Sequence, residues 1–174
     1  MDLEKILFII PQKDFRDEEY FVPRQILEEN GYAIETASID LGDCISSAGE
    51  TVTSGLSLAE IASDEGYLAI VFVGGSGTAT LIGDQSALTL AKIFFEDNKL
   101  VCAICWAPAI LAKSGIVYGH KLTAWSGARG DIEAAGGIYT GEDVTADGNI
   151  ITAVGPAAST DFGNKIIEKL ESNY

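Results

Sequence analysis

The sequence lacks long apolar runs and an excess of basic side chains, and each shortage excludes a class of protein. Its longest apolar runs, LAIVFV and LVCAICW, are far shorter than the roughly 20 residues that a membrane span needs. Since no basic segment precedes an apolar one near the N-terminus, we expect a soluble cytoplasmic protein that binds no membrane. Lys and Arg total 11 against 26 Asp and Glu, and the resulting net charge of −15 disfavours nucleic acid as a partner.

Cysteine is scarce, and its spacing excludes two common roles. The three cysteines are Cys44, Cys102 and Cys105, an odd number without the two C-x-x-C pairs of a structural zinc site. We therefore expect reduced thiols, with neither a disulfide framework nor a metal. The chain also lacks a GxxxxGK[ST] phosphate loop and the spacing of a dinucleotide fingerprint, so we expect no cofactor.

What the chain does contain is enough apolar sequence for one core. It has 174 residues, of which 47% are hydrophobic, so we expect a single domain over residues 1–174. Apolar runs of strand length alternate with segments of helical period, which predicts an α/β fold with a doubly wound, mostly parallel sheet and helices on both faces. The predicted strands are 5–10, 32–38, 68–73 and 100–104, and the predicted helices are 18–30, 85–97 and 106–114.

The remaining segments carry turn and cap signals. Asp147-Gly148 lies between two β-rich runs in 138–154, which predicts a small β-hairpin. Residues 41–57 are polar and glycine-rich, which suggests a short strand pair or excursion. Ser159 or Thr160 is a plausible N-cap of a closing helix. Three glycines are expected to end helical stretches as left-handed C-caps, namely Gly31, Gly66 and Gly115.

Cys105 is the candidate reactive residue, because it ends the strand 100–104 where the next helix begins. Ligands of doubly wound sheets gather at the carboxyl ends of strands. A sharp turn there would expose the thiol as a nucleophile elbow does, and unpaired helix amides would favour the thiolate. Pro108 supports an early helical position. The alternative is that Cys105 is a small buried apolar residue, as Cys102 in mid-strand is expected to be, whereas Cys44 in a polar loop is expected to be exposed and oxidisable.

Two further strand ends support a site. The run LAIVFV leads into Gly74-Gly75-Ser76-Gly77, where missing side chains let backbone amides approach an anion, as an oxyanion hole requires. The first strand leads into an acidic cluster that contains Asp17 and Glu19, although acids in a first helical turn commonly do no more than complement the helix dipole.

Together these motifs resemble the ThiJ/PfpI superfamily, which includes relatives of protein deglycases and of glyoxalase III with a class I glutamine amidotransferase-like, flavodoxin-like fold. The resemblance spans nearly the whole chain. Its carriers are F-x-D-x-E-x-x-x-P at 15–23, the glycine pair at 74–75, A-I-C-x-x-P-x-x-L-A-x-x-G at 103–115, and D-G-N followed by I-I-T-A-V-G-P and an S-x-x-F helix.

The resemblance implies roles for particular residues. Cys105 would be the nucleophile, Glu19 the carboxyl that faces it, and the backbone at Gly74, Gly75 and Trp106 would line an oxyanion site. Because two acids in contact cannot both ionise freely, we expect Glu19 to stay protonated and to bind a Cys105 thiolate.

The sequence departs from this family at two positions where other members carry histidine. Members described as peptidases have histidine directly after the cysteine, where this chain has Trp106. Members described as deglycases often have histidine where this chain has Trp125. The one histidine, His120, precedes a strand and is given a structural role. Trp106 and Trp125 either make a narrow, apolar pocket beside the thiol or pack in a core or subunit interface.

Three functions follow from these residues and the resemblance. The first is a cysteine-dependent enzyme that acts on small reactive carbonyls or on their protein adducts, without glutathione, metal or nucleotide. The second is a non-enzymatic redox or stress-response protein that senses oxidation at Cys105. The third is an intracellular peptidase, which Trp106 disfavours. The resemblance also implies a homo-oligomer, either a dimer or a hexamer.

Overall fold

A parallel sheet forms the centre of the molecule in the computed structural model, which describes residues 3–172. In this part of the chain the sheet has seven strands in the order β11-β12-β8-β7-β1-β3-β6, and only the β11–β12 pair is antiparallel. The strands are β1 (Lys5–Ile9), β3 (Ala33–Ser38), β6 (Leu56–Ser57), β7 (Tyr67–Phe72), β8 (Leu100–Ile104), β11 (Val144–Asp147) and β12 (Ile150–Ala153). The prediction of a doubly wound α/β fold is confirmed.

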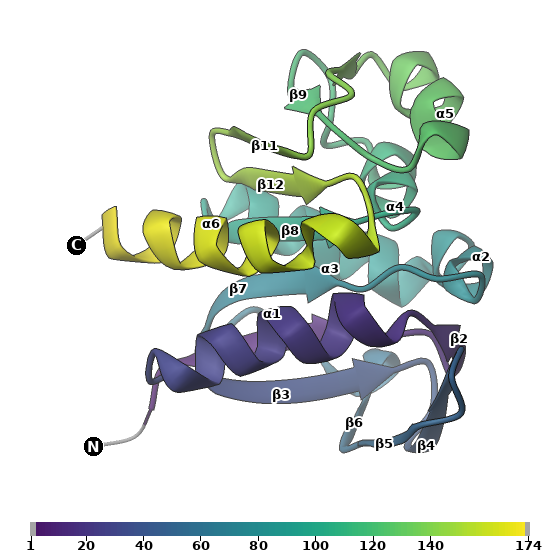
Figure 1. Cartoon of the computed structure of the whole chain (residues 1–174), viewed down its shortest axis with the longest axis vertical. Helices are drawn as coiled ribbons and strands as arrows, with labels where there is room; N and C mark the ends of the chain where they lie inside the picture. The colour runs from purple at the N-terminus through teal and green to yellow at the C-terminus, as the bar shows by residue number, and fades with distance from the viewer. Residues whose placement is uncertain (1–2, 173–174) are drawn as a thin grey trace.

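Helices cover both faces of this sheet. Helices α1 (Asp17–Glu29) and α6 (Ser159–Ser172) lie side by side over one face, and α3 (Gln85–Glu96) lies behind the sheet in the same view (Figure 1). The second face also carries α4 (Pro108–Ser114) and the short α2 (Thr78–Ile82), both in contact with α3.

The strands are apolar throughout because both of their faces are buried. Along β1, Leu7 and Ile9 join the core under α3 and α4, while Ile6 and Phe8 join the core under α1 and α6. Strand β8 divides in the same way, and Cys102 lies fully buried on the α6 side, as predicted. Burial of alternate side chains on opposite faces is what near-continuous apolar strands indicate.

Two small sheets lie beside the central one. The first joins β2 (Lys13–Phe15), β4 (Gly42–Ser46) and β5 (Thr51–Ser54), and the second pairs β9 (Lys121–Leu122) with β10 (Ile138–Tyr139). Short connections complete the chain, namely α5 (Arg129–Ala134) and the 3-10 turns η1 (Leu58–Glu60), η2 (Ser126–Ala128) and η3 (Pro156–Ala158). The excursion predicted at 41–57 is confirmed, and the predicted hairpin is β11–β12, which forms one edge of the central sheet.

Three local predictions were wrong. Gly66 has a φ of 83°, but it follows a loop and not a helix. Ser159 does not cap α6 from outside: turn η3 runs directly into the helix, so Ser159 already has helical backbone angles, and its buried hydroxyl has no hydrogen-bond partner. Cys44 is fully buried, because its strand β4 packs that side chain inward beneath the small sheet.

Gly31 and Gly115 match the cap prediction, with φ values of 90° and 84°; Gly115 directly follows α4, and Gly31 follows Asn30, the C-cap of α1. Such angles are readily adopted only by glycine. Within residues 3–172, no helix is long and apolar enough to cross a membrane.

Candidate active site

A pocket of about 390 Å³ opens where the carboxyl ends of the strands meet the loops that follow them. It brings together side chains and backbone from the loops after β2, β4, β7, β8, β9 and β12. The pocket is lined by Arg16, Glu19, Ser47, Gly75, Ser76, Cys105, Trp106, Trp125 and Pro156. The residues predicted to be catalytic, Cys105 and Glu19, therefore share one cavity.

Cys105 occupies a strained turn between β8 and α4. Its φ of 63° is a left-handed conformation that side chains other than glycine adopt at a cost of roughly 1–3 kcal/mol. Two hydrogen bonds hold it there: the Cys105 amide donates to the Ala153 carbonyl at 2.9 Å, and the Cys105 carbonyl accepts from the Trp125 amide at 2.8 Å. The thiol is half-buried and lines the pocket, so the sharp strand-to-helix turn that the prediction required is present.

The expectation that helix amides make Cys105 a thiolate is not supported. Helix α4 begins at Pro108, three residues after the thiol, and has only seven residues. Burial first, and then the neighbouring Glu19 carboxylate, raise the pKa of Cys105 to about 12, while the Trp106 amide and the charge of Arg16 lower it. Desolvation and a like charge therefore outweigh one amide and one cation.

Glu19 lies in the first turn of α1 and is fully buried. The Gly74 amide donates to its Oε2 at 2.9 Å, and its Oε1 has no hydrogen-bond partner among the residues that the structure describes. Burial raises the pKa of the Glu19 carboxyl to about 7, although contact with Cys105 and the Gly74 amide acts in the opposite direction. A carboxyl with a pKa near neutrality and a free oxygen is suited to accept and return a proton.

Glu19 and Cys105 titrate as a pair, because each changes the pKa of the other. The pair loses its first proton near pH 7 and its second near pH 12, so that it holds one proton between these values. That proton lies mainly on Cys105, so the expected thiolate beside a protonated Glu19 is not the favoured arrangement. It forms when the proton passes from Sγ to the carboxylate.

The two glycines after β7 have different roles. The Gly74 amide is used by Glu19, so it positions the acid and is not free to bind an oxyanion. A Cβ at Gly74 would lie 2.5 Å from Oε2 of Glu19 and 2.9 Å from Cβ of Cys105, which shows how closely the two residues converge. Gly75 has a φ of 117°, and among the described residues its amide donates to no acceptor. Gly75 and Trp106 are therefore the amides suited to bind an oxyanion.

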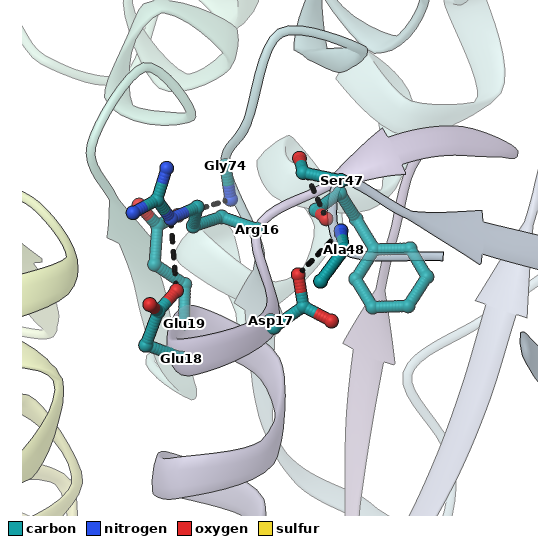
Figure 2. A network of polar contacts seen from close by, with 8 residues as sticks. Arg16, Asp17, Glu18, Glu19, Ser47, Ala48 and Gly74 are labelled. Atoms are coloured by element: carbon teal, nitrogen blue, oxygen red, sulfur yellow. Dashed lines mark hydrogen bonds and ion pairs between the residues drawn. The ribbon is translucent and has the colours of Figure 1, made fainter. Parts of the chain in front are cut away.

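A polar network fixes the start of α1 against the neighbouring loops (Figure 2). The Arg16 amide donates to the Gly74 carbonyl at 3.0 Å, and Nε of Arg16 donates to Glu18 at 2.8 Å. Figure 2 also shows Asp17 accepting from the Ala48 amide at 3.1 Å, beside Ser47 at the tip of the β4–β5 hairpin. These contacts bring Arg16 and Ser47 to the rim of the pocket.

The two tryptophans meet at the pocket, as one of the alternatives predicted. Their rings are T-shaped, with centroids 5.9 Å apart and planes at 68°. Trp106 also packs against the core, while Trp125 remains 46% exposed. His120 does not line the pocket; its Nδ1 lies 3.6 Å from Asp147 and its ring meets the edge of Phe95, so its structural role is supported.

Sequence reasoning missed Arg16, Ser47 and Gly127. Arg16 is the N-cap of α1, three residues before Glu19, and the N-cap and third helical position lie close together, which would have indicated its place. Ser47 gave no signal, because a hairpin tip reaches the pocket only through the tertiary fold. Gly127 follows Trp125 by two residues, and a Cβ there would lie 2.2 Å from the indole ring.

Comparison with known proteins decides the family. The family model described as the DJ-1/PfpI family matches residues 4–169. The chain belongs to the DJ-1/PfpI family. An uncharacterized protein of Methanocaldococcus jannaschii is 37% identical over 172 residues, which cover 97% of this chain and 83% of that protein. A Thermococcus kodakarensis protein named deglycase TK1284 is 31% identical over 150 residues, which cover 86% of this chain and 90% of that protein.

Solved structures of DJ-1/PfpI relatives agree with this fold. The ThiJ/PfpI domain protein of Brachyspira murdochii is 31% identical, covers 99% of each chain and has a TM-score of 0.94. DJ-1beta of Drosophila melanogaster is 25% identical, with 97% of this chain and 91% of that chain covered and a TM-score of 0.87. Within residues 3–172, this DJ-1/PfpI chain holds no cluster of three or more His, Cys, Asp or Glu side chains suited to a metal ion.

Proposed function

We propose that this protein is a cysteine-dependent enzyme that acts on small reactive carbonyls such as methylglyoxal, or on their adducts with proteins. The observation that carries the proposal is the convergence of the Cys105 thiol and the unpartnered Oε1 of Glu19 on one pocket. The similarity to a protein named as a deglycase supports the same class of chemistry.

The proposed reaction converts a 2-oxoaldehyde and water to a 2-hydroxy acid. The Cys105 proton passes to Glu19, and the thiolate then adds to the aldehyde carbon. The new C–S bond displaces the carbonyl electron pair onto oxygen, near the amides of Gly75 and Trp106, and Glu19 returns the proton to that oxygen. This gives a hemithioacetal on Cys105 and leaves Glu19 ionised.

Glu19 then acts as the base of an isomerisation. It removes the proton from the carbon bonded to sulfur and delivers it to the adjacent carbon, while the hydroxyl proton passes between the two oxygens. The product is a 2-hydroxy thioester. Glu19 takes a proton from water as the water attacks this thioester, the C–S bond breaks, and the 2-hydroxy acid leaves the pair with its single proton restored.

The decisive experiment follows conversion of methylglyoxal to lactate by NMR in the absence of glutathione. We expect repeated turnover by the wild-type protein. Cys105→Ala should abolish it, and Glu19→Gln should reduce kcat by about 10²-fold or more, because a general base contributes this much. Equal inertness of all three proteins would contradict the proposal.

A second candidate is redox sensing through Cys105. Cys105 reaches the pocket, while Cys44 and Cys102 are fully buried, so peroxide should oxidise Cys105 selectively. Selective oxidation, measured by mass spectrometry, without any turnover would favour this function. A peptidase is less well supported, because Trp106 follows the cysteine and His120 does not line the pocket.

We further propose that the protein is cytoplasmic and forms a homo-oligomer, either a dimer or a hexamer, with no nucleic-acid or membrane partner. Its free cysteines suit a reducing compartment. Light scattering coupled to size-exclusion chromatography measures the number of subunits directly, and a monomeric mass would contradict the oligomer.

A further inference from the structure

The aromatic wall of the pocket, defined as Trp106 and Trp125, presents more apolar surface than a three-carbon substrate needs. The two rings stand at 68° to each other, so a flat group that lies against one of them meets the edge of the other. Trp125 is 46% exposed although it belongs to a cavity lining, and a large aromatic surface left open inside a cavity is typical of a ligand site.

Backbone links place this wall at a fixed position relative to the nucleophile. Trp106 directly follows Cys105 in sequence. The Trp125 amide donates to the Cys105 carbonyl at 2.8 Å, so the loop that carries the second ring is attached to the same residue. A substituent on a carbonyl that is attacked by Cys105 therefore comes close to both rings.

Gly127 makes the position of Trp125 possible. A Cβ at residue 127 would lie 2.2, 2.3 and 2.6 Å from three atoms of the Trp125 indole. The positive φ values of the chain do not include Gly127, so glycine is needed there for space. The indole thus folds back over turn η2, in a position that requires a residue without a side chain at 127.

The size of the pocket also favours a substrate larger than methylglyoxal. Its volume of about 390 Å³ lies within the range of roughly 300–1,000 Å³ that is typical of pockets for larger organic ligands. Methylglyoxal would fill a small part of this space and would leave the aromatic wall in contact with water.

We propose that the aromatic wall binds the flat, apolar substituent of the substrate, so that aryl 2-oxoaldehydes are preferred to methylglyoxal. This inference rests on the proposed function. With phenylglyoxal as the probe, the balanced reaction consumes one water and gives mandelate and one proton. Trp125 is then a specificity-determining residue, and Gly127 is the residue that positions it.

The test compares kcat/KM for phenylglyoxal and methylglyoxal. We expect the wild-type protein to prefer phenylglyoxal by about tenfold or more, since an aromatic contact and the burial of the ring both favour the larger substrate. Trp125→Ala and Gly127→Ala should each lower this preference about tenfold, mainly through a higher KM for phenylglyoxal. Because 2-oxoaldehydes condense with guanidinium groups, the intact mass of the protein is measured after each assay.

Tyr118→Ala is the matched control. Tyr118 is 82% exposed, and its ring lies over Gly136 much as Trp125 lies over Gly127, but Tyr118 does not line the pocket. Its removal should leave the preference unchanged. A loss of preference equal to that of Trp125→Ala would overturn the assignment to Trp125.

A binding measurement tests the aromatic wall independently of catalytic turnover. Trp106 and Trp125 are the chain's 2 tryptophans, so its tryptophan fluorescence reports on this pocket. The measurement uses Cys105→Ala and is corrected for the quenching of free N-acetyltryptophanamide by each ketone. Acetophenone should change the fluorescence saturably, with half of the change at a concentration about tenfold lower than acetone requires. No saturable change would overturn the role of the wall.

The turnover results distinguish the remaining outcomes. Equal kcat/KM values for the two oxoaldehydes would overturn the aryl preference and leave the proposed function intact. Absence of turnover with both would overturn the proposed function and, with it, the inferred substrate class.

Discussion

Proton sharing between Cys105 and Glu19 is the central property of the site at the scale of single residues. Very little of the Cys105 thiol is ionised near neutral pH, because burial and the Glu19 carboxylate raise its pKa to about 12. The same carboxylate, with a pKa of about 7, can remove the thiol proton during attack. In the proposed reaction, the group that suppresses the free thiolate is therefore also the base that makes it available.

The pH dependence of alkylation tests this coupling. As the pH rises through about 7, Glu19 loses its proton and becomes able to accept one from Cys105. The rate of Cys105 alkylation by iodoacetamide should therefore rise with a midpoint near pH 7 in the wild type. Glu19→Gln should lose this midpoint, and its rate should keep rising with pH above 7, because no carboxylate titrates beside the thiol and the thiolate fraction grows steadily. A midpoint near 7 that persists in Glu19→Gln would assign it to another group.

Glu19 also makes the folding stability depend on pH. Its pKa is raised from 4.5 to about 7, so the folded state favours the protonated carboxyl. The contribution of Glu19 to the free energy of unfolding is fully present below pH 4.5 and is lost as the pH rises to about 7. Glu19→Gln cannot ionise, and its carbonyl oxygen can still accept from the Gly74 amide.

We therefore expect Glu19→Gln to become more stable than the wild type as the pH rises from 4.5 to 7. The gain should reach about 3 kcal/mol, because each unit of pKa shift corresponds to about 1.4 kcal/mol. Urea unfolding at several pH values measures the difference. A difference that is independent of pH would show that Glu19 ionises in the folded state as easily as in the unfolded one.

At the scale of elements, the site depends on how closely the loop after β7 packs against β2 and the loop that follows it. A Cβ at Gly77 would lie 1.9 Å from the carbonyl oxygen of Lys13 in β2, so this glycine is required for the approach of the two segments. The same contact surface includes the Arg16 amide and the Gly74 carbonyl. Displacement of one loop would therefore shift Glu19 relative to Cys105.

Gly77→Ala tests this packing, with Gly83→Ala as its control. A Cβ at Gly83, which ends α2, meets no atom within 4 Å, and its φ of −92° suits alanine. We expect Gly77→Ala to lower the free energy of unfolding by about 2 kcal/mol or more and to slow alkylation of Cys105. Gly83→Ala should change stability by less than about 0.5 kcal/mol. Equal effects of the two substitutions would contradict the proposed loop contact.

At the scale of the whole molecule, the net charge of −15 sets the electrostatic behaviour. Ion pairs such as Lys5–Glu35 and Arg129–Glu133 are partly exposed and neutralise few of the carboxylates. Mutual repulsion of the excess negative charges destabilises the compact state.

Salt should therefore stabilise the protein. Between about 20 mM and about 0.5 M NaCl, the screening length falls severalfold, and we expect Tm to rise by about 3–6 °C. Differential scanning calorimetry measures the shift. A fall in Tm over this range would show that attractive ion pairs outweigh the general repulsion.

The sequence by itself determined the fold class, most element positions and the two central residues of the site. Strand β8 was predicted with its observed bounds, because strands buried on both faces are apolar at every position. Cys105 was found from its place between a strand and a helix, which is local information. Glu19 came from its motif in the family that the chain resembles.

Only the tertiary structure decided the electrostatics and the walls of the pocket. The pKa of Cys105 rises because residues distant in sequence bury it and because Glu19 lies beside it. The hydrogen bond from the Trp125 amide to the Cys105 carbonyl brings the loop with Trp125 beside Trp106. Cys44 is buried by packing beneath a small sheet. The physical reason is the same in each case: desolvation and ring contacts depend on which loops the fold brings together, and sequence spacing does not specify that.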